Sequence, residues 1–197
     1  MKSDLIQKSR MLTILPGLLF LVLMALLCIQ AACSKASEEK PDTTNLVSTG
    51  PEIGPDSLLP AEYTCNGETA SIPLEWCGTP EGSRYFALIM QYEASPTDIH
   101  RYRLRCNIPS TINMLHRNAS GIGTQGSNCN NGRSGYAPPC SKGPGPKKYI
   151  FSQYALSDTA RVPLPSSRVN REVLLSAIKD VTISSASFTV VYSIAFK

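Results

Sequence analysis

The segment from Gly132 to Leu156 reads GRSGYAPPCSKGPGPKKYIFSQYAL, and it joins a loop rich in glycine and proline to an apolar strand. Proline fixes the backbone path of such a loop and glycine permits close approaches, so the loop is typical of a rigid wall around a small site. Residues 149–156 alternate with the period of a strand and predict a buried β-strand. Tyr136 stands inside the glycine turn, where packing alone does not require it, so we expect a pocket rim here.

Further strands are predicted on both sides of this segment. Residues 72–76 are a short candidate strand, residues 85–92 are almost continuously apolar, and residues 185–196 predict a long final strand. In residues 101–108, polar and mostly apolar side chains alternate along the chain. One face holds Arg101, Arg103 and Arg105, and the other holds Tyr102, Leu104 and Cys106. This pattern predicts a strand with one wet face and one dry face.

The remaining domain combines a long loop with one helix. Residues 109–146 are mostly loop, and a loop of this length inside a compact domain is usually functional. Residues 170–179 predict a helix that has Asn170 as its N-cap and an apolar stripe from Val173 to Ile178. Together the patterns predict a mainly β fold, an antiparallel β-sandwich with one or two short helices.

The first 32 residues predict an export signal. Basic residues precede residues 11–29, which carry no charge, and small residues then lead to Cys33. This layout is typical of a bacterial secretory signal that ends in a lipidated cysteine. Gln30 departs from the usual leucine three residues before the cysteine, so ordinary cleavage and an uncleaved membrane anchor remain alternatives to lipidation of Cys33. Each alternative places the rest of the chain outside the cytoplasm, in the cell envelope and facing the periplasm or the cell exterior.

Residues 33–57 predict a polar, flexible tether, and residues 58–197 predict one folded domain. The tether holds two basic and five acidic residues, whereas the domain holds fourteen basic and nine acidic residues. This mild positive charge does not favour nucleic acid as a partner. The five domain cysteines include no C-x-x-C pair and the two histidines lack ligand spacing, so we expect no zinc site, no other metal and no cofactor.

Ordered segments across the domain resemble a known family. They include ALIM (residues 87–90), CNIP (106–109), QGSN (125–128), GRSGYAPPC (132–140) and KKYIFSQYAL (147–156). In order and spacing they resemble the bacterial branch of the phosphatidylethanolamine-binding proteins, also called Raf kinase inhibitor-like proteins. The resemblance implies a β-sandwich with a small anion pocket, and binding rather than catalysis.

Three departures from the family pattern alter the implied pocket. The family's Asp-Pro-Asp-x-Pro turn corresponds to residues 92–96, where Tyr92 and Ala94 replace the acids. Tyr102 and Lys147 replace two histidines. The resemblance implies a ligand-binding set made of Arg133, Gly135, Tyr136, Pro138, Pro139, Tyr92, Tyr102 and Lys147. Such a pocket could take an anion through Lys147 and hydroxyl groups, or an apolar ligand in an aromatic slot.

Several of these residues also have a purely structural interpretation. Tyr136 either donates a hydrogen bond to a ligand or packs the loop, and Lys147 either contacts an anion or is solvated. The arginine face of residues 101–105 either meets an anionic partner or is solvated, and His100 is a candidate flank of the pocket. The resemblance implies a disulfide between Cys65 and Cys140. No nucleophile motif with a suitably spaced histidine is present, so we do not expect an enzyme.

The sequence therefore predicts an exported, membrane-tethered, non-catalytic binding protein. Its expected ligand is small and anionic or amphiphilic, such as a phosphoryl or lipid headgroup. The alternative is an envelope protein–protein interaction or inhibitor module in which the pocket is vestigial and the loop of residues 109–146 is the contact surface.

Overall fold

The computed structural model describes residues 45–141, 143 and 145–193. The predicted export signal and the lipidation of Cys33 lie outside the described residues. Within those residues, no helix combines the length and apolar character that crossing a membrane requires.

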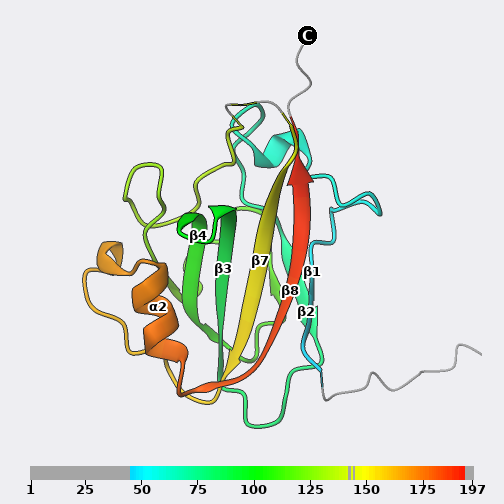
Figure 1. Ribbon diagram of the computed structural model, residues 1–197. Helices are drawn as coiled ribbons and strands as arrows, with labels where there is room; N and C mark the ends of the chain where they lie inside the picture. Colours follow the sequence, from blue (N-terminus) through cyan, green and yellow to red (C-terminus); the bar gives the residue numbers. More distant parts are fainter. Residues whose placement is uncertain (1–44, 142, 144, 194–197) are drawn as a thin grey trace, which may run out of the picture. The chain divides into compact units, whose positions relative to one another are not determined.

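A five-stranded antiparallel sheet forms the centre of the domain, with the strand order β6-β4-β3-β7-β8 (Figure 1). Its strands are β3 (Tyr85–Ser95), β4 (Asp98–Pro109), β6 (Thr124–Gln125), β7 (Lys147–Leu156) and β8 (Thr182–Tyr192). The apolar runs that predicted the strands at residues 85–92 and 149–156 occupy β3 and β7, next to each other in the middle of the sheet. β3 is buried continuously over residues 86–91, which explains its nearly continuous apolar character, whereas β7 alternates buried and half-buried residues.

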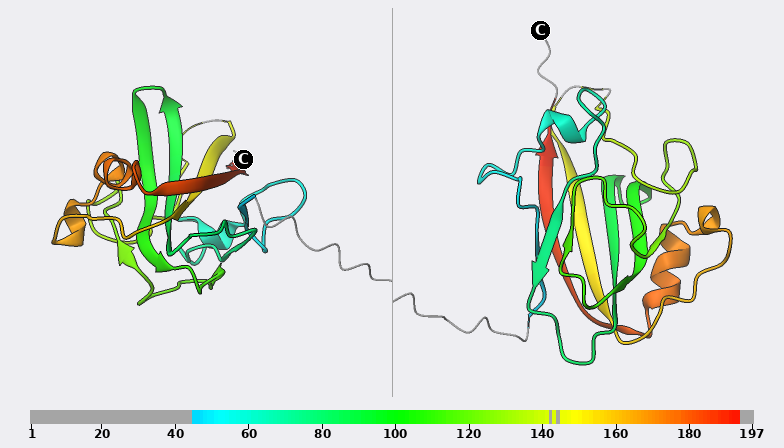
Figure 2. Two further views of the ribbon diagram at one scale, coloured as in Figure 1. Left: turned by 90° about the horizontal axis from the view of Figure 1, so that it is seen from below. Right: turned by 180° about the vertical axis from the view of Figure 1, so that it is seen from behind.

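A smaller antiparallel sheet covers one face of the large sheet, as the view from behind in Figure 2 shows. Its order is β1-β2-β5, formed by β1 (Val47–Thr49), β2 (Leu74–Cys77) and β5 (Met114–Leu115). The main apolar core lies between the two sheets, where Trp76 packs edge-on against Phe86 with ring centroids 5.3 Å apart. The mainly β sandwich predicted from the sequence is therefore confirmed.

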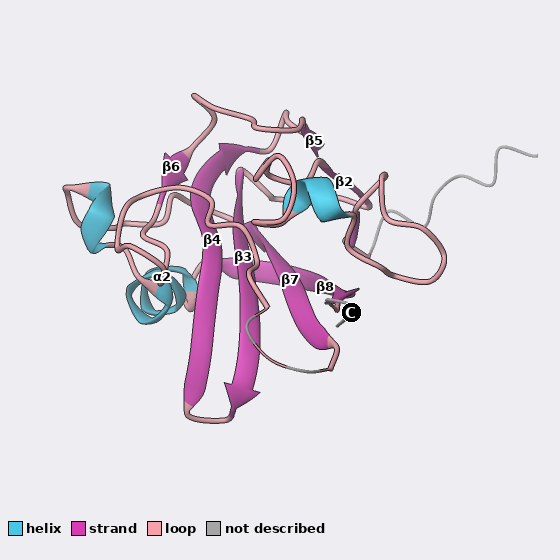
Figure 3. Cartoon of the chain, turned by 90° about the horizontal axis from the view of Figure 1, so that it is seen from above, coloured by secondary structure: helices cyan, strands magenta, loops and turns pink. Residues whose placement is uncertain are grey.

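A helical layer covers part of the other face of the large sheet, over β3 and β4 (Figure 3). The helix α2 (Arg171–Ile178) begins where the sequence predicts, because the Asn170 side chain accepts a hydrogen bond of 2.9 Å from the Val173 N–H. Leu174 and Ile178 are buried against Ile89 of β3. Two short 3₁₀ turns, η1 (Ala61–Tyr63) and η2 (Ser166–Arg168), complete the described helical structure.

The first strand corrects the predicted extent of the tether. β1 lies inside residues 33–57, and Leu46 and Ser48 are both buried. The Ser48 hydroxyl donates a hydrogen bond of 2.8 Å to the Gln153 side chain of β7. The predicted flexible tether is wrong for residues 46–49, because three residues are enough to add a short polar strand to β2.

Irregular pairing of β4 corrects its predicted wet face. Met90 pairs with Arg103 but Gln91 pairs with Arg101, so Tyr102 is an additional residue in a β-bulge. A bulge breaks the simple alternation, and Tyr102 and Arg103 both face the small sheet while Arg101 points to the helical side. Arg103 and Arg105 are each only 2% exposed. The prediction that the arginine row is a solvated face is therefore wrong for these two residues.

Candidate functional site

A hollow of about 480 Å³ opens where β3, β4 and the start of β7 meet the loop before β7. We call it the aromatic pocket. Its walls are Tyr92, His100, Tyr102, Asn130, Cys140 and Lys147. Tyr92 and His100 are cross-strand neighbours on β3 and β4, and Tyr92 is also paired with Tyr149 on β7. Strand pairing thus brings residues far apart in the sequence to one place.

The rings of this pocket form a connected cluster. The Tyr92 ring centroid lies 5.9 Å from that of His100 and 5.7 Å from that of Tyr149. Tyr149 in turn meets Tyr102 edge-on at 5.2 Å. The Lys147 ammonium lies 5.4 Å from the centre of the Tyr92 ring, which is within the range of a cation–π interaction. The pocket therefore offers aromatic surface with one cation beside it.

The polar groups of the pocket act as hydrogen-bond donors and carry no negative charge near neutral pH. Burial raises the pKa of Tyr102, and burial together with the nearby Tyr102 raises the pKa of Tyr149, so both phenols stay protonated near neutral pH. No lining residue carries a carboxylate; Asp98, which lies 3.1 Å from the His100 imidazole, is an exposed neighbour. An anionic group in the pocket could therefore contact the lysine ammonium and phenol O–H groups, and no carboxylate in the lining would repel it.

A disulfide holds one wall of the pocket in place. Cys65 and Cys140 are bonded to each other, with their Cα atoms 5.4 Å apart, as the family resemblance implied. The Cys65 N–H also donates to the Pro139 carbonyl at 3.0 Å, and the Ala137 N–H donates to the Tyr102 carbonyl at 2.7 Å. These bonds fasten the proline-rich loop both to the 61–68 segment and to β4.

Residues 49–193 match the sequence profile described as Phosphatidylethanolamine-binding protein. The chain belongs to the phosphatidylethanolamine-binding protein family. A UPF0098 protein of Methanothermobacter thermautotrophicus is 31% identical over 68% of this chain and 89% of the relative. The UPF0098 protein YbcL of Escherichia coli is 30% identical over 77% of this chain and 86% of its own length.

Solved structures show the same family fold. The crystal structure of Escherichia coli YbcL, described as a new member of the mammalian family, superposes with a TM-score of 0.67 and 27% identity. It covers 77% of this chain and 99% of the other. A family homologue from Chlamydia trachomatis gives a TM-score of 0.69 at 24% identity, with the same coverage.

The structure divides the family-derived residue set between two hollows. Tyr92, Tyr102 and Lys147 line the aromatic pocket. Tyr136 lines a second hollow with Arg103 and Arg105, and its hydroxyl donates to the Tyr63 carbonyl. Burial raises the pKa of the Tyr136 phenol, so the hydroxyl stays protonated and holds the loop in place through this hydrogen bond.

The other loop residues of the predicted set shape the walls. The Gly135 N–H donates to the Gly126 carbonyl at 3.0 Å, and Gly135 has a φ of 117°, which a side chain rarely permits. Pro139 is buried and Pro138 is partly buried. Arg133 is exposed, and its backbone carbonyl accepts a hydrogen bond from the Asn128 N–H. The structure shows no ligand-facing geometry for Arg133.

Sequence reasoning named His100 only as a flank and did not name Asn130 as a pocket residue, whereas Cys140 ends the GRSGYAPPC segment that was expected to form the pocket wall. His100 could have been found from parity, because it lies two residues before Tyr102 on the same strand. No sequence signal marks Asn130, which stands in the long loop. Across residues 45–141, 143 and 145–193, no three His, Cys, Asp or Glu side chains are grouped as a metal site.

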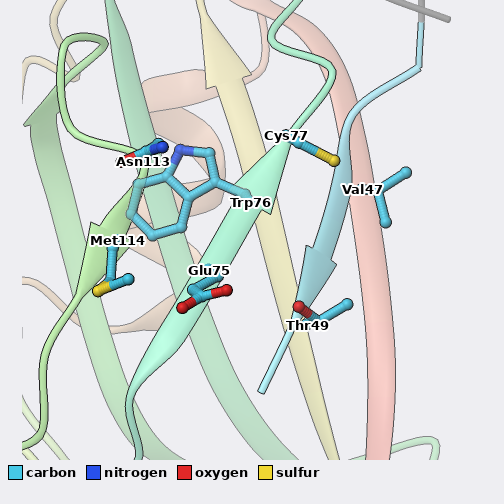
Figure 4. A pocket seen from close by; sticks show the side chains of 7 residues that line it. All are labelled: Val47, Thr49, Glu75, Trp76, Cys77, Asn113 and Met114. Atoms are coloured by element: carbon cyan, nitrogen blue, oxygen red, sulfur yellow. The ribbon is translucent and has the colours of Figure 1, made fainter. Parts of the chain in front are cut away.

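A third hollow of about 290 Å³ lies on the small sheet, and Figure 4 shows its lining side chains. They come from β1, β2, the first residue of β5 and Asn113 just before it, and Glu75 is the charged residue among them. The Cys77 thiol is exposed and free, and in Figure 4 it points toward β1. The hollow lacks a cluster of converging donors, so it is a weaker candidate site than the aromatic pocket.

Proposed function

We propose that this family member is a non-catalytic, extracytoplasmic binding protein, and that its aromatic pocket takes a small ligand with an anionic head and an apolar body. The observation that carries the proposal is the convergence of Lys147, Tyr92 and Tyr102 on one hollow whose lining has no carboxylate, with the buried Tyr149 ring packed behind the two tyrosines. An ammonium and phenol donors suit a phosphoryl or carboxylate group, and the ring faces suit an acyl or aromatic body.

The replacements in this chain support an amphiphilic ligand over a bare phosphate. Where the family pattern has acid and imidazole groups, Tyr92, Tyr102 and Lys147 supply two ring faces and a fixed cation. Tyr102 is buried at the wall of the pocket, so a ligand that reaches it loses water contact and gains apolar burial. The name of the family makes phosphatidylethanolamine the first lipid to test.

Location outside the cytoplasm is part of the proposal. The Cys65–Cys140 disulfide supports it, because disulfides persist in oxidising compartments and are rare in the cytosol. A lipid on Cys33 would keep the protein at a membrane surface, near amphiphilic ligands. Mass spectrometry of the membrane-extracted protein tests both points, and an unmodified N-terminus in a cytoplasmic fraction would contradict them.

Thermal unfolding with a soluble short-chain phosphatidylethanolamine tests the pocket. We expect the wild type to unfold at a higher temperature with this lipid than with phosphoethanolamine alone, because the acyl chains add apolar burial. The gain should be lost in Lys147→Ala. It should persist in Lys148→Ala, which removes the same charge from an exposed neighbour on the same strand. Stabilisation that survives Lys147→Ala would refute the proposed headgroup contact.

A negative result also has a meaning. If no amphiphile stabilises the wild type and an envelope protein co-purifies with it, the pocket is vestigial and the protein is an interaction or inhibitor module. Charge reversal in the loop of residues 109–146 would then abolish co-purification, whereas Lys147→Ala would not.

A further inference from the structure

The second hollow contains two buried arginines that face no acidic partner. It measures about 270 Å³, with Arg103 and Arg105 on its β4 wall and Thr69, Asn118, Ser120 and Gln125 around them. In the described part of the chain, neither guanidinium lies within 4.0 Å of a carboxylate. A buried guanidinium normally has a counter-ion, because removing a charge from water is expensive unless another charge compensates for it.

Backbone carbonyls use only part of the donor capacity of these side chains. Arg103 donates from Nη1 to the Ile72 carbonyl at 3.1 Å, and its Nη2 is buried with no partner. Arg105 donates to the Ile122 and Ala119 carbonyls at 2.6 and 2.7 Å, and its Nε is buried with no partner. Each arginine in the wall of the hollow thus keeps a buried N–H group that has no partner among the described residues.

The two acidic residues of the adjoining 61–68 segment are already paired with another arginine. Arg117 lies 3.1 Å from the Glu62 carboxylate and 2.7 Å from that of Glu68. Burial, reinforced by the neighbouring Arg105, lowers the pKa of Arg103 to about 9, so it is still charged near neutral pH. Two like charges therefore lie side by side, with no protein group among the described residues to neutralise them.

We propose that the hollow bounded by Arg103, Arg105 and Tyr136 binds a tetrahedral oxyanion, such as phosphate, sulfate or the phosphoryl head of a monoester. Such an ion accepts several hydrogen bonds at once, and its negative charge would compensate the two guanidinium charges in the wall of the hollow. Side-chain hydroxyls of Thr69 and Ser120 stand at the exposed mouth, where they can donate to its outer oxygens.

This site is separate from the aromatic pocket, and the proposal does not depend on that pocket being functional. The two lining sets share no residue. The Lys147 cation belongs to the aromatic pocket alone, whereas Arg103 and Arg105 belong to the second hollow. Variants can therefore assign an ion to one hollow or the other.

The test measures thermal unfolding and calorimetric binding of the full exported chain, extracted in detergent, with phosphate, sulfate and chloride at matched ionic strength. We expect phosphate and sulfate to bind and to raise the unfolding temperature, and chloride to do neither. Phosphoethanolamine forms a fourth arm. If phosphoethanolamine binds more tightly than phosphate, the preferred ligand of the hollow is a phosphate monoester. If it binds equally or more weakly, the preferred ligand is the free phosphate ion. Absence of binding by every oxyanion would overturn the proposal.

Two variants locate the ion. Arg103→Met should weaken phosphate binding at least tenfold. Ser120→Asp places a carboxylate at the mouth, so it should abolish phosphate binding and raise the unfolding temperature in phosphate-free buffer. This second variant keeps every buried group, so it remains informative if Arg103→Met does not fold. Thr79→Asp, which adds the same charge in the exposed loop after β2, should change neither property. Loss of binding in Lys147→Ala with retention in Ser120→Asp would overturn the proposal.

Discussion

Removing the Cys65–Cys140 disulfide should destabilise the domain by several kcal/mol. The two cysteines are separated by 75 positions, and the loop-entropy relation for a cross-link of this span gives about 4.5 kcal/mol near room temperature. Typical domains have a total stability of about 5–15 kcal/mol, so the loss is a large fraction of it. We therefore expect the double variant Cys65→Ser/Cys140→Ser to fold only marginally.

Urea unfolding followed by tryptophan fluorescence measures this loss, because Trp76 is buried in the main core. With a urea slope of about 2 kcal/mol/M, the midpoint should fall by about 2 M. Cys77→Ser, which replaces an exposed free thiol, should change stability by less than about 0.5 kcal/mol. A loss below about 1 kcal/mol in the double variant, or peptide mapping that pairs these cysteines differently, would refute the reasoning.

Three further substitutions test other parts of the structure by denaturant unfolding. Asn170→Ala should cost about 1 kcal/mol because it removes the helix cap, and Asn170→Ser should recover most of that loss; equal stability of all three proteins would contradict the capping role. Tyr136→Phe should cost about 1–2 kcal/mol because the Tyr63 carbonyl loses its donor, and an unchanged stability would show that water replaces the hydroxyl. Arg103 has a folded pKa of about 9, below its unfolded value, so its charge destabilises the fold and this cost declines as the residue deprotonates. Between about pH 8 and about pH 10 in phosphate-free buffer, the wild type should gain about 1 kcal/mol relative to Arg103→Met, and a constant difference would contradict the lowered pKa.

Much of the large sheet could be predicted from the sequence because its strands carry strong periodic signals. The apolar run of β3 follows from burial on both faces, and the alternation of β7 follows from one buried and one half-buried face. The helix was also predictable, since the Asn170 cap and the apolar stripe are local features. The final strand begins three residues earlier than predicted, at Thr182, because its first residues alternate exposed and half-buried positions and give a weak signal.

The features that escaped prediction depend on tertiary contacts. β1 is too short and polar to be recognised, and it exists because β2 presents an edge to it. The β4 bulge depends on pairing with β3, which a single sequence does not reveal, so a strict period of two misplaced Arg103 and Arg105. The same limit applies to the site: resemblance identified Tyr92, Tyr102 and Lys147, whereas Asn130 enters the aromatic pocket only through the path of its loop.

The bulge in β4 also links the walls of the two hollows along the backbone. Tyr102 lines one hollow and Arg103 lines the other, and because of the bulge these consecutive residues face the same side of the sheet. One peptide bond therefore joins the walls of both hollows, and a backbone shift at this point moves a side chain in each. Affinities measured at one hollow should accordingly be measured with the other both empty and filled. Any coupling between them must be equal in both directions, since linkage is reciprocal.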